Sequence, residues 1–406
     1  MSRKRRRRPL TPKERALLRR KRKRRRLILI LAELLVLAVL GVAAFVVLKL
    51  DLMNYNPLNE KNLDIYQDTG DYTNIALFGL DSREGELEKG ARSDSIIIAS
   101  INNKTKEVKL LSVYRDTLLK QDDDTYDKAN SAYFYGGPEA AIALLNRNLD
   151  LDIKKYISVN FNALSDIIDA LGGLEIDVTE EEVPYVNAYT VENIKVTGKD
   201  SLGIESAGLQ TLNGIQATAY ARIRYTSGDD FKRTERQRLV LQKIAEKAQA
   251  ADISTLNRII DQVLPEISTN LTAANFMGLA ANGLKYSIGE RKGFPFDVTT
   301  SESVRNHDGS YVIPIGFSDN VSQLHQFLFG DKDYKPSDLV EEISNDIIYL
   351  SGVDPADYTT NDFSSSDNED SSGDPSDSSD EEDSSSDSGS DYNDSSDEED
   401  TGGYYD

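Results

Sequence analysis

The chain of 406 residues contains no cysteine and no tryptophan, and it has only two histidines, His307 and His325. Without cysteine the protein has no disulfide bond, no thiol nucleophile and no cysteine-ligated metal site. Neither histidine stands in a recognisable chemical motif, so the most common general base of enzymes is missing from any obvious site. We therefore expect carboxylates and a metal ion to perform any acid–base chemistry.

Charge is divided unevenly along the chain, around a formal net value of −22. Residues 1–26 hold sixteen Lys and Arg and one acid, which predicts a basic tail. Residues 361–406 hold eighteen Asp and Glu, no Lys or Arg, and many Ser and Gly. Such a composition cannot bury enough apolar surface to fold, so we expect residues 351–406 to be a disordered acidic tail.

Residues 27–50 are apolar apart from Glu33 and Lys49. At about 1.5 Å per residue they can cross a hydrocarbon core of about 30 Å as one transmembrane helix. A secretory signal peptide is the competing interpretation, but its apolar region is usually about 7–15 residues long and ends at a small-residue cleavage site. The basic residues 1–26 predict a cytoplasmic N-terminus, which places the rest of the chain outside the cell membrane. Contact with membrane lipid explains this basic tail more simply than nucleic-acid binding does.

Residues 51–71 form a polar linker in this interpretation, and residues 72–350 are long enough for one large α/β domain. The stretch TNIALFGLD ends an apolar run on Asp81. It predicts a buried strand that delivers an acid at its C-terminal end, where open α/β sheets carry their sites. Helix and strand patterns then alternate, with helices predicted at 138–149, started by Pro138, and at 161–171.

Two strand patterns, SDSIIIASI and VKLLSVYRD, flank a hairpin signal at residues 102–105. In an antiparallel pair the start of one strand lies beside the end of the next. Arg92 and Asp94 should therefore meet Arg115 and Asp116 at one edge of the sheet, where the strand ending on Asp81 also arrives.

The stretch ARIRYTSGDDFKRTERQR, residues 221–238, concentrates six Lys and Arg in an acidic chain. On the long helix predicted from Phe231, Arg233 and Gln237 are four residues apart and share a stripe with Leu241 and Ile244. These two polar residues therefore extend the core-facing side of the helix. Arg222 and Arg224, two apart in a segment predicted to be extended, share one face as well.

Two other arginines of this helix, Arg236 and Arg238, diverge from the stripe and are expected to be ordinary surface charges. The inward arginines need anionic partners, because an isolated buried charge is very costly. One interpretation is a static salt-bridge network with the aspartates Asp81, Asp94, Asp116, Asp229 and Asp230.

The other interpretation is a site for a multiply charged anion. Arginine forks bind phosphate oxygens in pairs, and pyrophosphate offers enough oxygens to engage several of them. The carboxylates would then be positioned for a divalent cation. With oxygen ligands only, Mg²⁺ is the natural choice, and Mn²⁺ is the alternative.

Four blocks resemble the LytR–CpsA–Psr family: GLDS (79–82), RSDSI (92–96), YRDT (114–117) and ARIRYTSGDDFKRTERQ (221–237). The resemblance covers roughly residues 72–350. It implies an α/β/α sandwich with a central mixed β-sheet flanked by helices, preceded by one transmembrane helix, on the outer face of Gram-positive bacteria. Members of the family transfer glycopolymers (teichoic acid or capsular polysaccharide) from polyprenyl pyrophosphate to peptidoglycan.

By resemblance, each group in these blocks also has a role. Asp81 and Asp94 would hold Mg²⁺, and Arg115 and Asp116 match the block tied to catalysis. The residues that would grip the pyrophosphate are Arg92, Arg115, Arg222, Arg224, Arg233 and Gln237. The family pattern also includes an apolar channel for the lipid. The apolar faces of the helices at 138–149 and 161–171 could line it, and core packing explains those faces equally well.

The chain departs from the family pattern at two positions. Tyr114 stands where proline is common, and Arg238 stands where a second glutamine often follows. Neither change removes a charged group from the expected site.

The reaction implied by the resemblance is attack by the 6-hydroxyl of N-acetylmuramic acid on phosphorus, which leaves a phosphodiester. Asp94 or Asp116 would accept the hydroxyl proton, although a metal-bound oxygen or the substrate itself could do so. A pyrophosphatase acting on lipid-linked intermediates is one alternative. A membrane-tethered regulator, a lipid-carrier-binding protein and a wall-anchored adhesin are others. The predicted topology separates the folded domain from DNA, so we expect no nucleic-acid partner.

Overall fold

The computed structural model describes residues 54–81, 87, 89–224, 229–305 and 307–358. The predicted basic tail 1–26, the predicted transmembrane helix 27–50 and nearly all of the predicted acidic tail 351–406 therefore lie outside the described residues. Among the helices that are described, none combines the length and the apolar character that crossing a bilayer requires.

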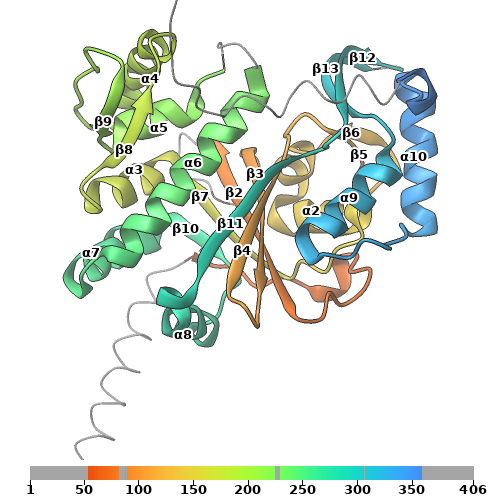
Figure 1. Cartoon of the computed structure of the whole chain (residues 1–406), viewed down its shortest axis with the longest axis horizontal. Helices are drawn as coiled ribbons and strands as arrows, with labels where there is room; N and C mark the ends of the chain where they lie inside the picture. The colour runs from red at the N-terminus through yellow and green to blue at the C-terminus, as the bar shows by residue number, and fades with distance from the viewer. Residues whose placement is uncertain (1–53, 82–86, 88, 225–228, 306, 359–406) are drawn as a thin grey trace, which may run out of the picture. The chain divides into compact units, whose positions relative to one another are not determined.

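A mixed β-sheet forms the centre of the described region (Figure 1). Within the described residues it has seven strands, which are, in order across the sheet, β1 (Asn54–Tyr55), β10 (Ile267–Thr269), β7 (Lys155–Asn160), β2 (Tyr72–Asp81), β3 (Arg92–Asn102), β4 (Glu107–Val113) and β11 (Ser287–Phe294). β2 runs parallel to β7 and antiparallel to β3, and β4 runs antiparallel to β3 and parallel to β11. The sheet is therefore mixed, as the family resemblance implies.

The run of isoleucines in β3 explains why both faces of the sheet are covered. Side chains alternate between faces along a strand. Ile96 and Ile98 belong to the larger core on one face, whereas Ile97 packs with Leu110 and Leu241 on the other. A strand buried on both faces gives a continuous apolar run instead of an alternating pattern.

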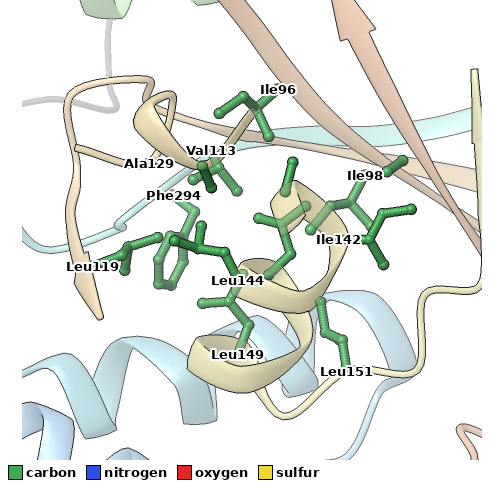
Figure 2. Close-up of a cluster of buried hydrophobic side chains, with 14 of the residues drawn as sticks. Ile96, Ile98, Val113, Leu119, Ala129, Ile142, Leu144, Leu149, Leu151 and Phe294 are labelled. Atoms are coloured by element: carbon green, nitrogen blue, oxygen red, sulfur yellow. The ribbon is translucent and has the colours of Figure 1, made fainter. Parts of the chain in front are cut away.

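Three helices cover the first face: α2 (Ser131–Leu149), α9 (Phe317–Phe329) and α10 (Asp338–Ser351). Figure 2 shows the core between α2 and the sheet, where Ile142 and Leu144 lie near Ile98 and Val113. Phe294, at the end of β11, is fully buried in the same cluster.

Helix α2 begins at Ser131, about two turns earlier than the sequence pattern predicts. Gly137 has a positive φ of 68°, which breaks the helical geometry, and Pro138 follows it inside the helix. Glycine tolerates this backbone conformation, and proline is favoured in the first turn of a helix. The predicted start at Pro138 is therefore the start of the second segment of a kinked helix, not of the helix itself.

The other face carries a helical layer that surrounds the candidate site. Its members are α3 (Phe161–Ala170), α4 (Glu182–Thr197), α5 (Gly214–Arg222), α6 (Asp229–Ala250) and α7 (Ile253–Val263). A two-stranded sheet of β8 (Leu174–Val178) and β9 (Gly208–Leu212) packs with this layer. Helix α8 (Ala273–Asn282) leads into β11.

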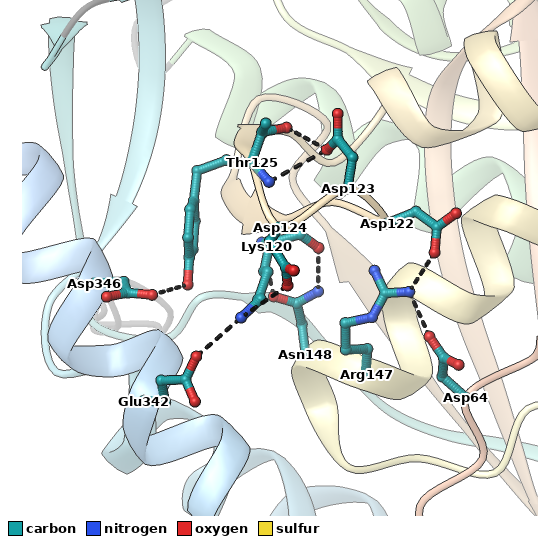
Figure 3. A network of polar contacts seen from close by, with 11 residues as sticks. Asp64, Lys120, Asp122, Asp123, Asp124, Thr125, Arg147, Asn148, Glu342 and Asp346 are labelled. Atoms are coloured by element: carbon teal, nitrogen blue, oxygen red, sulfur yellow. Dashed lines mark hydrogen bonds and ion pairs between the residues drawn. The ribbon is translucent and has the colours of Figure 1, made fainter.

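Two smaller hairpins complete the first face: β5 (Leu118–Lys120) with β6 (Tyr126–Lys128), and β12 (Val298–Val304) with β13 (His307–Pro314). Figure 3 shows the polar contacts that fasten the β5–β6 hairpin. Lys120 Nζ lies 3.0 Å from a carboxylate oxygen of Glu342 on α10, and the Tyr126 hydroxyl donates to Asp346 at 2.7 Å. These contacts hold the chain that follows Asp116 in place.

Residues 54–71, predicted as a linker, lie along the domain wherever they are described. β1 pairs with β10, and Leu63 is fully buried in the larger core. Asp64 also forms an ion pair with Arg147 of α2 (Figure 3).

Candidate active site

The predicted meeting of charged residues at one edge of the sheet is confirmed for Asp94 and Arg115 but not for the side chain of Arg92. In the β2–β3 register the backbone of Asp81 lies opposite Arg92, so the end of β2 adjoins the start of β3. Arg115 follows β4, and its Nη1 donates to Asp94 Oδ1 at 2.8 Å. The side chain of Asp81 lies outside the described part of the structure.

Asp94 is the hub of this site, because guanidinium groups from three segments reach it. Its second oxygen, Oδ2, accepts from Arg224 Nη2 at 3.1 Å, and its main-chain oxygen accepts from Arg233 Nη2 at 3.1 Å. The Asp94 side chain is 18% exposed, and that of Arg115 is 17% exposed. Hydrogen bonds to ionised groups gain strength where water is largely excluded.

Asp116 stands beside this hub and holds Arg115 from the other side. Arg115 Nε donates to Asp116 Oδ2 at 3.0 Å, and Lys128 Nζ from β6 lies 3.1 Å from Asp116 Oδ1. Arg115 therefore spans two carboxylates, which fixes the direction of its guanidinium plane. Hydrogen bonding within the β5–β6 hairpin positions Lys128 for this contact.

A cavity of about 450 Å³ opens beside Asp94, between the sheet and the helical layer. Its wall is mostly apolar, and the apolar residues come from β2, β3, β7, α3 and α6: Leu77, Ile97, Ile157, Val159, Leu164, Ile167, Val240, Leu241 and Ile244. Its polar wall includes Asp94, Arg222, Arg224, Arg233 and Gln237. A cavity with an apolar body and cationic groups in its wall suits an amphiphile with an anionic head.

The structure therefore places the predicted residues in two groups. Asp94, Arg222, Arg224, Arg233 and Gln237 line the cavity. Arg115 and Asp116 do not line it but join the same hydrogen-bonded cluster through Asp94.

Arg92, the remaining predicted pyrophosphate ligand, lies at the exposed start of β3. Its guanidinium carbon is 5.6 Å from the centre of the Phe134 ring.

The described side chains show only part of the predicted salt-bridge network, because the side chains of Asp81, Asp229 and Asp230 lie outside them. Among the described side chains the cluster holds four cations (Arg115, Lys128, Arg224 and Arg233) and only two carboxylates (Asp94 and Asp116). Clustered guanidinium groups in a partly buried site suit an anionic ligand such as phosphate.

The inward stripe predicted on α6 is also confirmed, because Arg233, Gln237, Leu241 and Ile244 all line the cavity. Arg233 is only 2% exposed. The buried Oε1 atom of Gln237 has no hydrogen-bond partner among the described residues. It leaves an acceptor available for a donor group of a ligand.

The prediction that Arg236 and Arg238 are surface charges is wrong, since they are only 6% and 7% exposed. Arg236 Nε donates to Glu182 Oε1 at 2.7 Å, and its Nη1 reaches the main-chain oxygen of Ile223. Two elements far away in the sequence, α4 and β11, cover this side of α6.

Helix α4 contributes site residues that the sequence motifs do not identify. Arg222 donates to Asn193, and its Nη2 lies 3.6 Å from Glu192 Oε2. The rings of Tyr189 and Phe161 lie 5.3 and 4.7 Å from its guanidinium carbon. The spacing of positions 189, 192 and 193 along one helical face was the available signal.

The predicted lipid channel is half right. Phe161, Leu164 and Ile167 of α3 line the cavity, as predicted for the helix at 161–171. The helix predicted at 138–149 lies in α2 on the opposite face of the sheet, where Ile142 and Leu144 fill the larger core. Periodicity identifies an apolar helical face, but it does not say which side of a sheet that face covers.

Among the described residues, no cluster of three or more His, Cys, Asp or Glu side chains is arranged to hold a metal ion. Mg²⁺, however, typically uses one or two protein carboxylates and completes its shell with phosphate oxygens and water. Asp94 supplies a carboxylate at the cavity wall. The donor chemistry therefore fits Mg²⁺ bound together with an anionic substrate.

The sequence is similar to those of known proteins. Bacillus subtilis TagT, a polyisoprenyl-teichoic acid–peptidoglycan teichoic acid transferase, is 30% identical over 212 residues, which cover 52% of this chain and 63% of TagT. The chain thus spans less than two thirds of the length of that relative.

Two solved structures share the fold. A Streptococcus agalactiae protein has a TM-score of 0.54 at 27% identity, covering 66% of this chain and 90% of that one. The structure of TagT bound to LI-WTA has a TM-score of 0.50 at 25% identity, covering 66% of this chain and 94% of that one. The family model described as LytR_cpsA_psr family matches residues 49–312. The chain therefore belongs to the LytR–CpsA–Psr family.

Proposed function

We propose that this protein is a membrane-anchored extracellular phosphotransferase. It moves a glycopolymer, either teichoic acid or capsular polysaccharide, from polyprenyl pyrophosphate to the 6-hydroxyl of N-acetylmuramic acid in peptidoglycan, and leaves a phosphodiester. The relative named as a teichoic acid transferase and the structure of TagT bound to LI-WTA support this proposal. The predicted topology supports the location, with the N-terminus in the cytoplasm and the catalytic domain outside.

The observation that carries the proposal is the apolar cavity with its arginine-rich wall. The apolar body offers a polyprenyl chain a surface that water does not compete for. Arg222, Arg224 and Arg233 stand in the same cavity wall and offer guanidinium forks to the attached pyrophosphate. A hydrophilic phosphate ester would gain nothing from contact with the apolar body, and an uncharged lipid would form no ion pair with the arginines.

The reaction follows from these parts. The acceptor hydroxyl attacks the phosphorus that carries the glycopolymer, a new P–O bond forms, and the bond to the bridging oxygen breaks. Polyprenyl monophosphate leaves with that oxygen. The arginines stabilise negative charge on the equatorial and leaving oxygens, which is most of what phosphoryl transfer requires from a protein.

Mg²⁺ is part of the proposal, with Asp94 and Asp81 as the protein ligands. When bound, it would supply additional positive charge beside the pyrophosphate oxygens. Asp94 would keep Arg115 and Arg224 oriented toward the same oxygens.

The proton of the acceptor hydroxyl needs a destination, and Asp94 and Asp116 are the carboxylates within the cluster. Asp94 has the better position, because it lines the cavity whereas Asp116 does not. Both oxygens of Asp94 accept guanidinium donors, so an anionic substrate would have to take over one of these guanidinium groups before Asp94 could accept the proton.

Hydrolysis of lipid-linked intermediates by the same site is the second candidate, because water can replace the acceptor hydroxyl. The distinguishing experiment uses the full-length chain in detergent with Mg²⁺, a lipid-pyrophosphate-linked glycan and peptidoglycan oligomers. Wild type is compared with Arg115→Ala and Asp81→Ala. Glycan that appears on peptidoglycan only with wild type supports the transferase. Phosphorylated glycan released at the same rate without peptidoglycan would support the hydrolase, and binding without cleavage would contradict both.

A further inference from the structure

We call the cavity beside Asp94 the lipid cavity. A second hollow, of about 460 Å³, lies on a different face of α6. We call it the α6–β11 cleft. Its charged lining is Glu182 of α4, Arg291 of β11, and Lys232, Glu235, Arg236 and Arg238 of α6. None of these residues lines the lipid cavity. The two hollows therefore share one helix but no charged residue.

The charges in the α6–β11 cleft do not balance. Arg236 Nε lies 2.7 Å from Glu182 Oε1, and Lys232 Nζ lies 3.1 Å from Glu235 Oε2. These two ion pairs use both carboxylates of the cleft. Arg238 and Arg291 have no carboxylate within ion-pair distance among the described residues, so the cleft carries two unmatched positive charges.

Arg238 makes this imbalance costly, because it is only 7% exposed. Its Nη1 atom is buried and has no hydrogen-bond partner in the described part of the chain. Burial is the main cause that lowers the pKa of Arg238. Tyr114 and Glu235 oppose this lowering, and the charge of Arg291 adds a smaller lowering effect. A buried, incompletely bonded guanidinium beside a second cation is unfavourable unless an anion binds there.

We propose that the α6–β11 cleft binds a phosphate group, at a site separate from the lipid cavity, and that this phosphate belongs to the glycopolymer being transferred. The second half of the proposal rests on the proposed function. A phosphodiester presents two free oxygens, which suits the forks of Arg238 and Arg291 together. The volume of the cleft also exceeds what a single phosphate ion needs, so a sugar or polyol attached to the phosphate has room.

The position of the cleft explains what such a contact would achieve. Arg238 directly follows Gln237, which lines the lipid cavity, and both are on α6. A polymer with repeated phosphates could be held by its pyrophosphate end in the cavity and by a later phosphate in the cleft. Two linked contacts raise the effective concentration of the second one and would favour phosphate-rich polymers over neutral ones.

The test is a titration of the full-length chain in detergent with short, lipid-free oligo(glycerol phosphate). Wild type is compared with Arg238→Gln and Arg291→Gln. Lys243→Gln is the matched control, because Lys243 is on the same helix, pairs with Glu246 at 3.8 Å and lies outside the cleft. We expect each cleft variant to raise the dissociation constant about tenfold, and the control to leave it unchanged. Inorganic phosphate should compete with the oligomer for wild type and for Lys243→Gln.

Arg291 is exposed, so Arg291→Gln keeps the test valid even if Arg238→Gln impairs folding. Unchanged affinity in Arg291→Gln and in a folded Arg238→Gln would overturn the proposal. Tighter binding of a peptidoglycan stem-peptide carboxylate, with the same sensitivity to both variants, would overturn the phosphate assignment. If the cleft variants weaken oligomer binding but the protein transfers no glycan, the phosphate site in the cleft is supported and the proposed function is refuted. If the protein transfers glycan but the variants bind the oligomer as wild type does, the proposed function is supported and the phosphate site is refuted.

Discussion

Arg115 and Asp94 form a 2.8 Å ion pair that connects the chain after β4 to the start of β3. The β3–β4 hairpin brings the two residues together, and Asp116 holds Arg115 from its other side at 3.0 Å. Asp94 in turn holds Arg224 at 3.1 Å. One carboxylate therefore orients two arginines from different parts of the chain, and one of them, Arg224, lines the cavity.

Loss of the Asp94 charge should disable the reaction more than it weakens substrate binding. We expect Asp94→Asn to lower the transfer rate about 100-fold, because both arginines lose the partner that orients them toward developing charge. The measurement is glycan transfer to peptidoglycan oligomers at saturating lipid substrate. Asp166→Asn is the control, since Asp166 forms a 2.7 Å ion pair with Lys199 and does not line the cavity. Equal rates in the two variants would remove Asp94 from the mechanism.

Filling the apolar body of the cavity should separate lipid binding from head-group binding. Ile244 lines the cavity, and a tryptophan there would occupy space that a polyprenyl chain needs. We expect Ile244→Trp to weaken binding of a long-chain polyprenyl pyrophosphate at least about tenfold, with little change for inorganic pyrophosphate. Leu202→Trp is the control, because Leu202 is 84% exposed. A uniform loss for both ligands would indicate that the cavity does not hold the lipid chain.

The ion pair between Arg236 and Glu182 should matter for stability, contrary to the expectation of a surface charge. Both side chains are under 10% exposed. Removing one partner leaves a buried charge, so we expect Glu182→Gln to lower the free energy of unfolding by about 3–5 kcal/mol. Glu192→Gln, which removes an exposed partner of Arg222, should cost less than about 1 kcal/mol. Urea unfolding of the two variants compares these costs, and similar values would contradict the prediction.

His325 should make the protein less stable in mild acid. It is 3% exposed, its ring stacks on Tyr334 with the centroids 3.5 Å apart, and its Nε2 donates to the Leu149 oxygen at 3.0 Å. Burial lowers its pKa from the ordinary 6.5, against opposing effects of the Leu149 oxygen and nearby aspartates. The unfolded chain therefore binds this proton at a higher pH than the folded chain does.

The contribution of His325 is complete above about pH 6.5 and is lost as the pH falls from there toward the folded-state pKa. The loss amounts to at most about 1.4 kcal/mol per pH unit. Unfolding free energies at pH 7.5 and 5.5 should differ less for His325→Gln than for wild type. The exposed His307, changed to Gln, should behave as wild type. An identical pH dependence in all three proteins would exclude His325 as the cause.

Several features of the site follow from local sequence alone. The hairpin signal at residues 102–105 correctly predicts that Asp94 and Arg115 meet, because a tight connection leaves antiparallel strands only one way to pair. The stripe from Arg233 to Ile244 is equally local, because the helical repeat decides which side chains share a face. These predictions needed no information about distant parts of the chain.

Other features depended on which elements pack together. Arg236 and Arg238 are buried because α4 and β11, distant in sequence, cover their side of α6, and a helical repeat shows one apolar stripe but not a second covered face. The sequence could not decide on which side of the sheet the apolar helix at 138–149 lies, because both faces of β3 are apolar and either could accept it. Sequence by itself determined which residues share a strand end or a helical face. Tertiary packing alone decided what faces them, since contacts between distant elements follow from the pairing of whole surfaces and not from local periodicity.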